Sequence, residues 1–356
     1  MTLDAAIIGG GPAGAAAAIS LRRLMPAAAL AIFDSGTGKR WRPGEVLSPG
    51  AASLLQSLGC WPEFLAGGFI ESFGTRAAWG SAEAHENEFL FGTRGDGWRL
   101  DRARFDAMML ERARASGVLV HRGAALTESG VDGAGWRLRF RGVAECRARF
   151  VIDASGRAAA FAVQRGARHL PDDRLAGVFV LFETALPEDG DPLIEAAETG
   201  WWYSAGVPGS RAVAAFMTDT DLIRESQLHR PCRWNDILAG TMYTRARLRN
   251  AIPEGPPAVF AAQSHRLSRM GGEGWVAAGD AAMTFDPLSS QGILKALRSG
   301  KLASFVAADF LMKGVASQDR LETLAEAEYS GYRQIKQKYY HAEQRWPDAL
   351  FWRRRR

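Results

Sequence analysis

The chain has 356 residues, enough for one large domain or two interleaved domains with a sizeable core. A hydrophobic fraction of 47% and a charged fraction of 23% are those of an ordinary globular protein, and a net charge of +5 is too small to indicate nucleic-acid binding. The three cysteines are widely spaced and form no CxxC pair, which argues against disulfides or a metal site and favours a reducing cytoplasm.

The chain begins with a strand, a turn and a helix. Leu3–Ile8 is a short apolar run typical of a buried strand, and the Ala-rich stretch 15–24 predicts a helix. Ala29–Phe33 predicts a second buried strand, which ends at Asp34. These elements form a βαβ unit, and such a unit belongs in a parallel sheet.

Gly9, Gly11 and Gly14 form a GxGxxG motif in the turn of this unit. Such glycines permit a tight turn, let a pyrophosphate approach the backbone and let the helix pack closely on the strand. The N-terminus of the following helix favours phosphate. An acid at the position of Asp34 can accept hydrogen bonds from an unphosphorylated ribose, which favours FAD or NAD over NADP. The predicted dinucleotide-binding residues here are Gly9, Gly11, Ala13, Gly14, Asp34 and Ser35.

The rest of the chain alternates between helical and strand-like segments. Apolar spacing predicts helices at residues 51–58, 101–115, 291–310 and 320–340. Apolar or alternating runs predict strands at residues 118–120, 136–140, 146–152, 178–182, 201–205, 212–217 and 275–278. This order predicts a mixed α/β fold, in which a Rossmann-like domain is interleaved with a smaller antiparallel-sheet substrate domain and followed by C-terminal helices.

The expected domain limits follow from these blocks. They are 1–72, 100–170 and 262–312 for the dinucleotide-binding domain, 73–99 and 171–261 for the substrate domain, and 313–356 for a C-terminal helical segment. The terminal run Arg353–Arg356 is expected to be a solvated basic tail, with a docking contact for an acidic partner as the alternative. No segment has the length and apolar composition of a membrane span, so we expect a soluble cytoplasmic protein.

Three later features follow the first motif in a recognisable order. Arg102 opens a helix, the run Asp153-Ala154-Ser155-Gly156-Arg157 ends a strand, and Gly279-Asp280 ends another strand shortly before Asp286-Pro287 and Gly292. In this order they resemble the motifs of the two-dinucleotide-binding FAD-dependent oxidoreductases and monooxygenases. In that superfamily the arginine contacts FAD phosphate, the late aspartate holds the ribityl chain, and the last helix start faces the flavin pyrimidine and stabilises reduced flavin. The resemblance implies FAD as cofactor, with the further binding residues Arg102, Gly279, Asp280, Pro287, Gly292 and Ile293.

Two segments narrow the resemblance to one branch of that superfamily. Gly44-Glu45-Val46-Leu47-Ser48-Pro49 is similar to the Gly-Glu-x-x-x-Pro segment of the tryptophan halogenase-like branch, and residues 200–208 are similar to its Trp-containing strand. Within the branch, residues 286–292 and the tail from Arg345 to Trp352 most resemble the maturation flavoproteins of quinone-cofactor amine and amino-acid oxidases. Those flavoproteins are thought to hydroxylate a tryptophan of a partner protein.

A missing lysine separates halogenation from hydroxylation. Halogenases of this branch use a lysine in the N-terminal half, but this chain has none between residues 40 and 294, and Arg76 stands in the segment where it should lie. An arginine stays protonated and cannot replace an amine that must react. The resemblance implies an FAD-dependent monooxygenase that hydroxylates an aromatic, indole- or tryptophan-like substrate through a C4a-hydroperoxyflavin. The alternatives are a flavin-dependent double-bond reductase, a halogenase and an FAD-binding assembly factor without turnover.

Few side chains outside the cofactor motifs are candidates for chemistry. Glu45 is the candidate catalytic residue, Trp201, Trp202 and Tyr203 are candidates for lining a substrate pocket, and His265 is expected to be structural. The expected substrate is an aromatic small molecule or a tryptophan of a partner protein. Because no second GxGxxG is present, either NAD(P)H that binds transiently or a separate flavin reductase is expected to supply the electrons.

Overall fold

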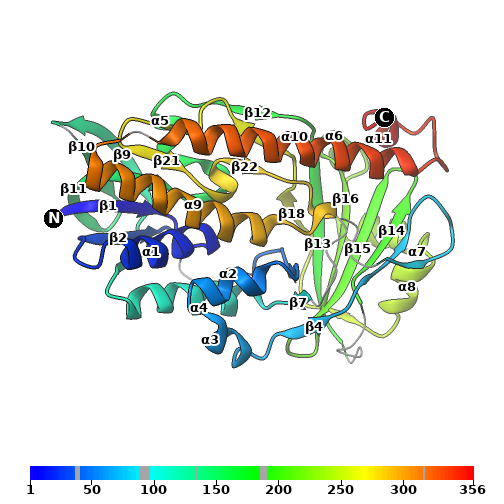
Figure 1. Cartoon of the computed structure of the whole chain (residues 1–356). Coiled ribbons are helices and arrows are strands. Elements are labelled where there is room, and N and C mark those ends of the chain that lie inside the picture. The colour runs from blue at the N-terminus through cyan, green and yellow to red at the C-terminus, as the bar shows by residue number, and fades with distance from the viewer. Residues whose placement is uncertain (37–40, 88–96, 134, 185–190, 316) are drawn as a thin grey trace.

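The computed structural model describes residues 1–36, 41–87, 97–133, 135–184, 191–315 and 317–356. It has two main sheets, which lie toward opposite ends of the molecule in Figure 1, and the long helix α10 (Gln318–Ala342) runs past both of them. The predicted mixed α/β fold class is confirmed. Residues 88–96 of the predicted substrate segment and Lys39 lie outside the described residues.

The first sheet is mainly parallel, with the strand order β20-β21-β11-β1-β2-β8 and the antiparallel strands β10 and β9 continuing from β11. Ile8 at the end of β1 pairs with Asp153 on β11 and with Phe33 on β2, so the carboxyl ends of these strands meet at one edge. The strands are β1 (Thr2–Ile8), β2 (Leu30–Asp34), β8 (Leu119–Arg122), β9 (Leu126–Asp132), β10 (Gly135–Phe140), β11 (Val143–Asp153), β20 (Gly271–Gly272) and β21 (Trp275–Ala277).

Helices α1 (Pro12–Leu24) and α9 (Gly292–Lys313) pack together against this sheet. The small side chains of residues 15–18 are fully buried and let the two helices approach closely. At the crossing a Cβ on Gly300 would lie 2.1 Å from the carbonyl oxygen of Ala13, so only glycine fits there. The remaining helices around the sheet are α2 (Ala51–Ser57), α3 (Trp61–Leu65), α4 (Arg102–Ala115) and α5 (Ala160–Gln164).

The second sheet has the order β17-β13-β16-β15-β14-β5-β6, with β18 also paired to β13, and it is antiparallel except where β14 meets β5. Its strands are β5 (Thr75–Ala78), β6 (His85–Asn87), β13 (Leu175–Glu183), β14 (Leu193–Ala197), β15 (Gly200–Val207), β16 (Arg211–Asp219), β17 (Ile252–Pro253) and β18 (Ala258–Ala261). Helices α6 (Thr220–Glu225), α7 (Pro231–Ala239) and α8 (Tyr243–Arg247) accompany it. Trp234 of α7 packs on one face of the sheet, and Trp352 of the C-terminal segment packs on the other.

Two small sheets connect the parts. One has the order β3-β7-β4, from Val46–Leu47, Gly97–Arg99 and Ile70–Ser72, and the other has the order β12-β19-β22, from His169–Pro171, His265–Leu267 and Met283–Thr284. Short 3₁₀ turns lie at η1 (Gly156–Ala158), η2 (Gly279–Ala281) and η3 (Pro287–Ser289). β7 lies in the expected substrate domain, but it pairs with β3 and β4, which lie in the expected dinucleotide-binding domain. The expected domain limits stay a prediction.

The expectation of a solvated C-terminal tail is wrong. After α10 the chain turns back and forms α11 (Leu350–Arg353) against the second sheet. Arg355 is buried, donates to Asp219 at the end of β16 and lies over the ring of Phe351 at 3.7 Å, while Arg354 binds Asp219 and Asp221. The carboxylates of Asp219 and Asp221, on and after β16, bind Arg354 and Arg355 and hold the tail. Of the four terminal arginines, Arg355 is buried, while Arg353, Arg354 and Arg356 remain exposed.

No helix within the described ranges is both long enough and apolar enough for a bilayer crossing.

Replacing Arg355 tests the tail. Arg355→Ala is expected to lower the free energy of unfolding by about 2–3 kcal/mol, because it leaves the buried Asp219 carboxylate with fewer donors and removes the contact with Phe351. Chemical denaturation of the purified variants measures the change. The exposed Arg353→Ala is the matched control and should stay within about 0.5 kcal/mol of the wild type. Equal losses in both variants would contradict the docked tail.

Candidate functional site

A cavity of about 760 Å³ lies between the carboxyl edge of the first sheet and the inner face of the second sheet. Such a volume suits a cofactor or a small ligand. All predicted cofactor residues except Gly14 and Gly279 line it, as does Glu45. The lining residues from the prediction are Gly9, Gly11, Ala13, Asp34, Ser35, Glu45, Arg102, Asp280, Pro287, Gly292 and Ile293.

Gly14 and Gly279, the two predicted residues that do not line the cavity, lie where neighbouring backbone or side-chain atoms leave no room for a Cβ. A Cβ on Gly14 would lie 1.9 Å from the carbonyl oxygen of Gly9, so this glycine lets α1 start directly against the turn. A Cβ on Gly279, whose φ is +63°, would lie 2.7 Å from the Cβ of Ala13. Close packing therefore requires glycine at both positions, and their cofactor contacts stay a prediction.

The turn between β1 and α1 is an open cradle. Nothing lies within 4 Å of the Cβ position of Gly11, and no side chain caps the N-terminus of α1, so backbone N–H groups face the cavity. Asp34 ends β2 beside this turn, and its Oδ1 accepts a hydrogen bond from the N–H of Gly10 at 3.3 Å. The arrangement fits a pyrophosphate with a ribose next to it.

Arg102 and Asp280 bring charge to the cavity wall. Although burial alone would lower the pKa of Arg102, the neighbouring Asp106 outweighs it and holds the arginine cationic. Burial likewise would raise the pKa of Asp280, but Lys295 and Arg157 lower it, so this carboxylate is ionised. These charges suit a phosphate and a polyhydroxylated chain, and the roles expected for Arg102 and Asp280 stay predictions.

Lys295 is a site residue that the sequence analysis missed. Its side chain is 1% exposed and its Nζ donates to Asp280 Oδ1 at 2.7 Å, while the Asp280 side chain stays 41% exposed and lines the cavity. The sequence signal was a lysine within the apolar first turns of α9. A buried lysine requires a partner, and the aspartate of the Gly279-Asp280 motif is that partner.

Asp153 supports the site without lining it. Its carboxylate accepts hydrogen bonds from the hydroxyl of Ser155 and from the N–H groups of Phe161 and Ala162, which begin α5. Ser155 and Arg157, in the same motif, do line the cavity. The middle motif therefore acts through its turn, which Asp153 holds in place.

Glu45 is a buried carboxyl without a charged partner in contact. Its side chain is 3% exposed, Oε2 accepts from the N–H of Gly44 at 3.2 Å, and Oε1 has no hydrogen-bond partner among the described residues. Burial raises the pKa of Glu45 to about 7, although Arg102 nearby lowers it in part. A group of this kind exchanges a proton at neutral pH.

The half of the cavity formed by the second sheet is aromatic and apolar. Trp201 and Tyr203 line it, together with Phe179 and Phe260, whose rings lie 5.5 Å apart and both contact Trp41 at 5.7 Å. The hydroxyl of Tyr203 has no hydrogen-bond partner in the described part of the chain. Such walls suit a flat aromatic ligand with a polar group.

The expectation that Trp202 lines the pocket is wrong. Successive side chains of a strand point to opposite faces, so Trp202 lies on the other side of β15 and packs at 5.0 Å on Trp234 of α7. His265 does not line the cavity either: it bonds to Thr284 at 2.8 Å, and burial lowers its pKa to about 4. This histidine is neutral and structural, as predicted.

Known proteins share this sequence pattern and fold. A family model described as an FAD binding domain matches residues 2–329. LodB of Marinomonas mediterranea, which is named as an FAD-dependent oxidoreductase, is 30% identical over 99% of this chain and 96% of its own length.

Solved structures of a similar fold include the myxobacterial chondrochloren halogenase CndH, with 22% identity and a TM-score of 0.88 over 100% of this chain and 86% of its own. They also include the peptidyl tryptophan dihydroxylase QhpG, with 24% identity and a TM-score of 0.76 over 100% of this chain and 79% of its own.

Replacing Asp34 tests the cofactor end of the cavity. Asp34→Ala is expected to raise the dissociation constant for FAD by about 10–100-fold, because hydrogen bonds to a charged group contribute about 1.5–3 kcal/mol. Fluorescence titration of the apoprotein with FAD measures the change. The exposed Glu254→Ala serves as control and should bind like the wild type. Unchanged affinity in Asp34→Ala would show that the ribose lies elsewhere.

The raised pKa of Glu45 predicts a pH-dependent stability. The folded apoprotein holds a proton on Glu45 up to about pH 7, whereas the unfolded chain releases it near pH 4.5, so Glu45 destabilises the fold as the pH rises between these values. Glu45→Gln should therefore gain stability relative to the wild type between pH 5 and pH 8, by an amount on the order of 3 kcal/mol. Urea unfolding across this range measures it, with the exposed Glu71→Gln as control. A constant difference would refute the raised pKa.

Proposed function

The chain belongs to the FAD binding domain family and is an FAD-dependent oxidoreductase with FAD as its cofactor, and from this premise we propose that it is a monooxygenase. The proposed substrate is an indole-like aromatic group, such as the tryptophan side chain of a partner protein. The observation that carries the proposal is the aromatic half of the cavity, which adjoins the cofactor residues and holds Glu45 next to them.

The shape of the aromatic half supports an aromatic ring as substrate. The rings of Phe179, Phe260 and Trp201 line this half, together with the apolar side chains of Ile194 and Met217. Tyr203 adds a hydroxyl without a protein partner, which is available to an indole N–H or a backbone group of the substrate. The likeness to QhpG, which is named as a peptidyl tryptophan dihydroxylase, favours a tryptophan held in a polypeptide.

The distribution of lysines favours hydroxylation over halogenation. The sequence has no lysine between residues 40 and 294, which includes all strands of the second sheet. Lys295 lies in the cofactor half, where it is bonded to Asp280. Among the described residues, no lysine amine lines the aromatic half to handle an oxidised halide, even though halogenases such as CndH share the fold.

The proposed reaction balances with one molecule of oxygen. One oxygen atom enters an aromatic C–H bond and the other leaves as water, while NAD(P)H or reduced flavin from a separate reductase provides two electrons and protons complete the water. Bound FAD supplies the oxygen-transfer chemistry. The protein's share is to hold the ring against the cofactor, exclude water with apolar walls and move a proton.

Glu45 is the residue proposed to move that proton. Its Oε1 has no partner among the described residues, and its pKa of about 7 lets it both give and take a proton at neutral pH. The electrostatic neighbours of Glu45 are Arg102 on the cofactor side and Tyr203 on the substrate side. This position lets the carboxyl serve the reacting atoms from the boundary of the two halves.

Product mass tests the proposal. Purified protein with FAD, a reductase, NADH and oxygen is expected to add one oxygen atom to an indole compound or to a tryptophan-containing peptide, also when chloride and bromide are present. Mass spectrometry distinguishes this product from a halide or from the gain of two hydrogens that a reductase would give. Hydrogen peroxide as the sole product across aromatic substrates would overturn the proposal.

Glu45→Gln is the matched variant for this assay. It should lower the rate of hydroxylation by about 100-fold, the usual size of a general acid–base effect, and leave the dissociation constant for FAD within about threefold. The exposed Glu71→Gln controls for the loss of a carboxylate and should keep full activity. Full activity in Glu45→Gln would show that the Glu45 carboxyl does not transfer the proton. The proposal that the enzyme hydroxylates its substrate would still stand.

A further inference from the structure

The turn that precedes α9 forms part of the cavity wall and has an unusual backbone. Asp286, Pro287 and Ser290 line the cavity, and Asp286 is 1% exposed. Ser290 has a φ of +51°, a left-handed conformation that a residue other than glycine adopts only when its surroundings hold it. Within the turn, Asp286 Oδ1 accepts from the N–H of Leu288 at 2.9 Å. These internal bonds leave Asp286 Oδ2 and the N–H of Asp286 to be satisfied from outside.

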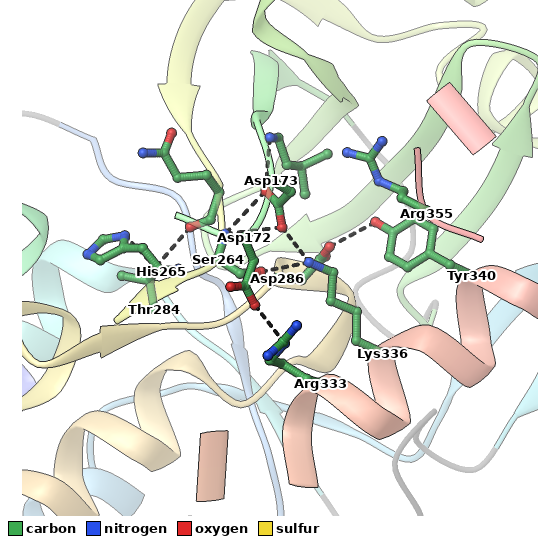
Figure 2. Close-up of polar contacts among 12 residues, drawn as sticks. Asp172, Asp173, Ser264, His265, Thr284, Asp286, Arg333, Lys336, Tyr340 and Arg355 are labelled. Atoms are coloured by element: carbon green, nitrogen blue, oxygen red, sulfur yellow. Dashed lines mark hydrogen bonds and ion pairs between the residues drawn. The ribbon is translucent and has the colours of Figure 1, made fainter. Parts of the chain in front are cut away.

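Two tyrosines of α10 provide those outside bonds. The hydroxyl of Tyr340 donates to Asp286 Oδ2 at 2.8 Å, and the N–H of Asp286 donates to the hydroxyl of Tyr332 at 2.7 Å. The tyrosines are eight residues apart, so they share one face of the helix, with Lys336 between them. Figure 2 shows Lys336 and Tyr340 reaching from α10 toward the turn.

Further bonds fix both hydroxyls. The hydroxyl of Tyr332 is hydrogen-bonded to the hydroxyl of Ser264 at 2.7 Å. Lys336 donates to the same serine at 2.9 Å and forms an ion pair with Asp173, as Figure 2 shows. The hydroxyl of Tyr340 accepts from Trp201 Nε1 at 3.1 Å. Because Trp201 lines the aromatic half of the cavity, Tyr340 connects the walls of both halves.

The docked C-terminal tail in turn holds Tyr340. Its ring contacts Trp352 at 6.0 Å and Phe351 at 6.2 Å, and the guanidinium of Arg355 lies 5.3 Å from its centre. Arg355 is anchored on Asp219. A continuous set of contacts therefore leads from the end of the chain to the cavity wall.

We propose that Tyr340 and Tyr332 are positioning residues for the FAD site: they hold the turn 286–290 in its cofactor-binding shape and make that shape depend on the docked C-terminal segment. Without the Tyr340 hydroxyl, a buried carboxyl oxygen of Asp286 and the Nε1 of Trp201 both lose a hydrogen-bond partner. The proposal requires FAD binding and is independent of the hydroxylation proposed above.

The test compares Tyr340→Phe and Tyr332→Phe with Tyr329→Phe. Tyr329 lies on the same helix and its ring also contacts Phe285, but no described hydrogen bond joins its hydroxyl to the turn. We expect each of the first two variants to raise the dissociation constant of the apoprotein for FAD about tenfold, and Tyr329→Phe to leave it unchanged. The visible circular dichroism of bound FAD, which reports the surroundings of the ring, should change only in the first two.

A double-mutant cycle separates positioning from general destabilisation. Asp286→Asn removes the acceptor charge, so adding Tyr340→Phe to it should weaken FAD binding by less than tenfold. Should Tyr340→Phe fail to fold, Tyr332→Phe and its cycle with Ser264→Ala make the same comparison. The proposal is overturned if the variants lower only the unfolding temperature and keep wild-type FAD affinity and dichroism, or if Tyr329→Phe changes both as much.

Discussion

The arrangement of strands and helices around the cavity depends on the close approach of the turn between β1 and α1 to the backbone of Ala154, and of α1 to α9. A Cβ on Gly9, whose φ is +106°, would lie 2.2 Å from the carbonyl oxygen of Ala154, the residue directly after β11. The same crowding occurs where Gly300 of α9 meets Ala13. Because two strands and two helices converge here, the N-termini of α1 and α9 both open onto one cavity, and each brings the partial positive charge of a helix start to it.

The charges around this cavity divide it chemically. In the cofactor half, Arg102 is paired with Asp106 and Asp280 with Lys295, so each ionised group keeps its charge inside the protein. Glu45 differs from these paired groups because burial has the largest effect on its pKa, and burial favours the neutral carboxyl. One wall therefore holds paired charges that stay ionised, and the boundary between the two halves holds Glu45, whose carboxyl has a pKa near neutral pH.

The sequence predicts the lining around the glycine turn better than the lining of the aromatic half. Gly9, Gly11 and Asp34 act within one βαβ unit, where their spacing alone fixes their geometry. The alternation of side chains along a strand separates Trp202 from Trp201 and Tyr203, and this alternation is already present in the sequence of residues 201–203. The partners of Lys295 and Arg355 were not predictable in this way. A buried lysine and a buried arginine are recognised only from the carboxylates that meet them, which lie 15 and 136 residues away.

This difference has a physical origin in how the two halves are built. The cofactor half uses turns whose shape is set by glycine and by hydrogen bonds within a few residues, so a short motif carries the information. The aromatic half is a surface made by strands β13 to β16 and β18, and its position relative to the glycine turn rests on contacts between distant segments, such as Trp201 with Tyr340. Changes on this surface can alter the ligand while the glycine turn stays intact, since the two share few residues. A common fold can therefore support halogenation in one protein and, as proposed, hydroxylation in this one, with the side chains facing the aromatic half deciding between them.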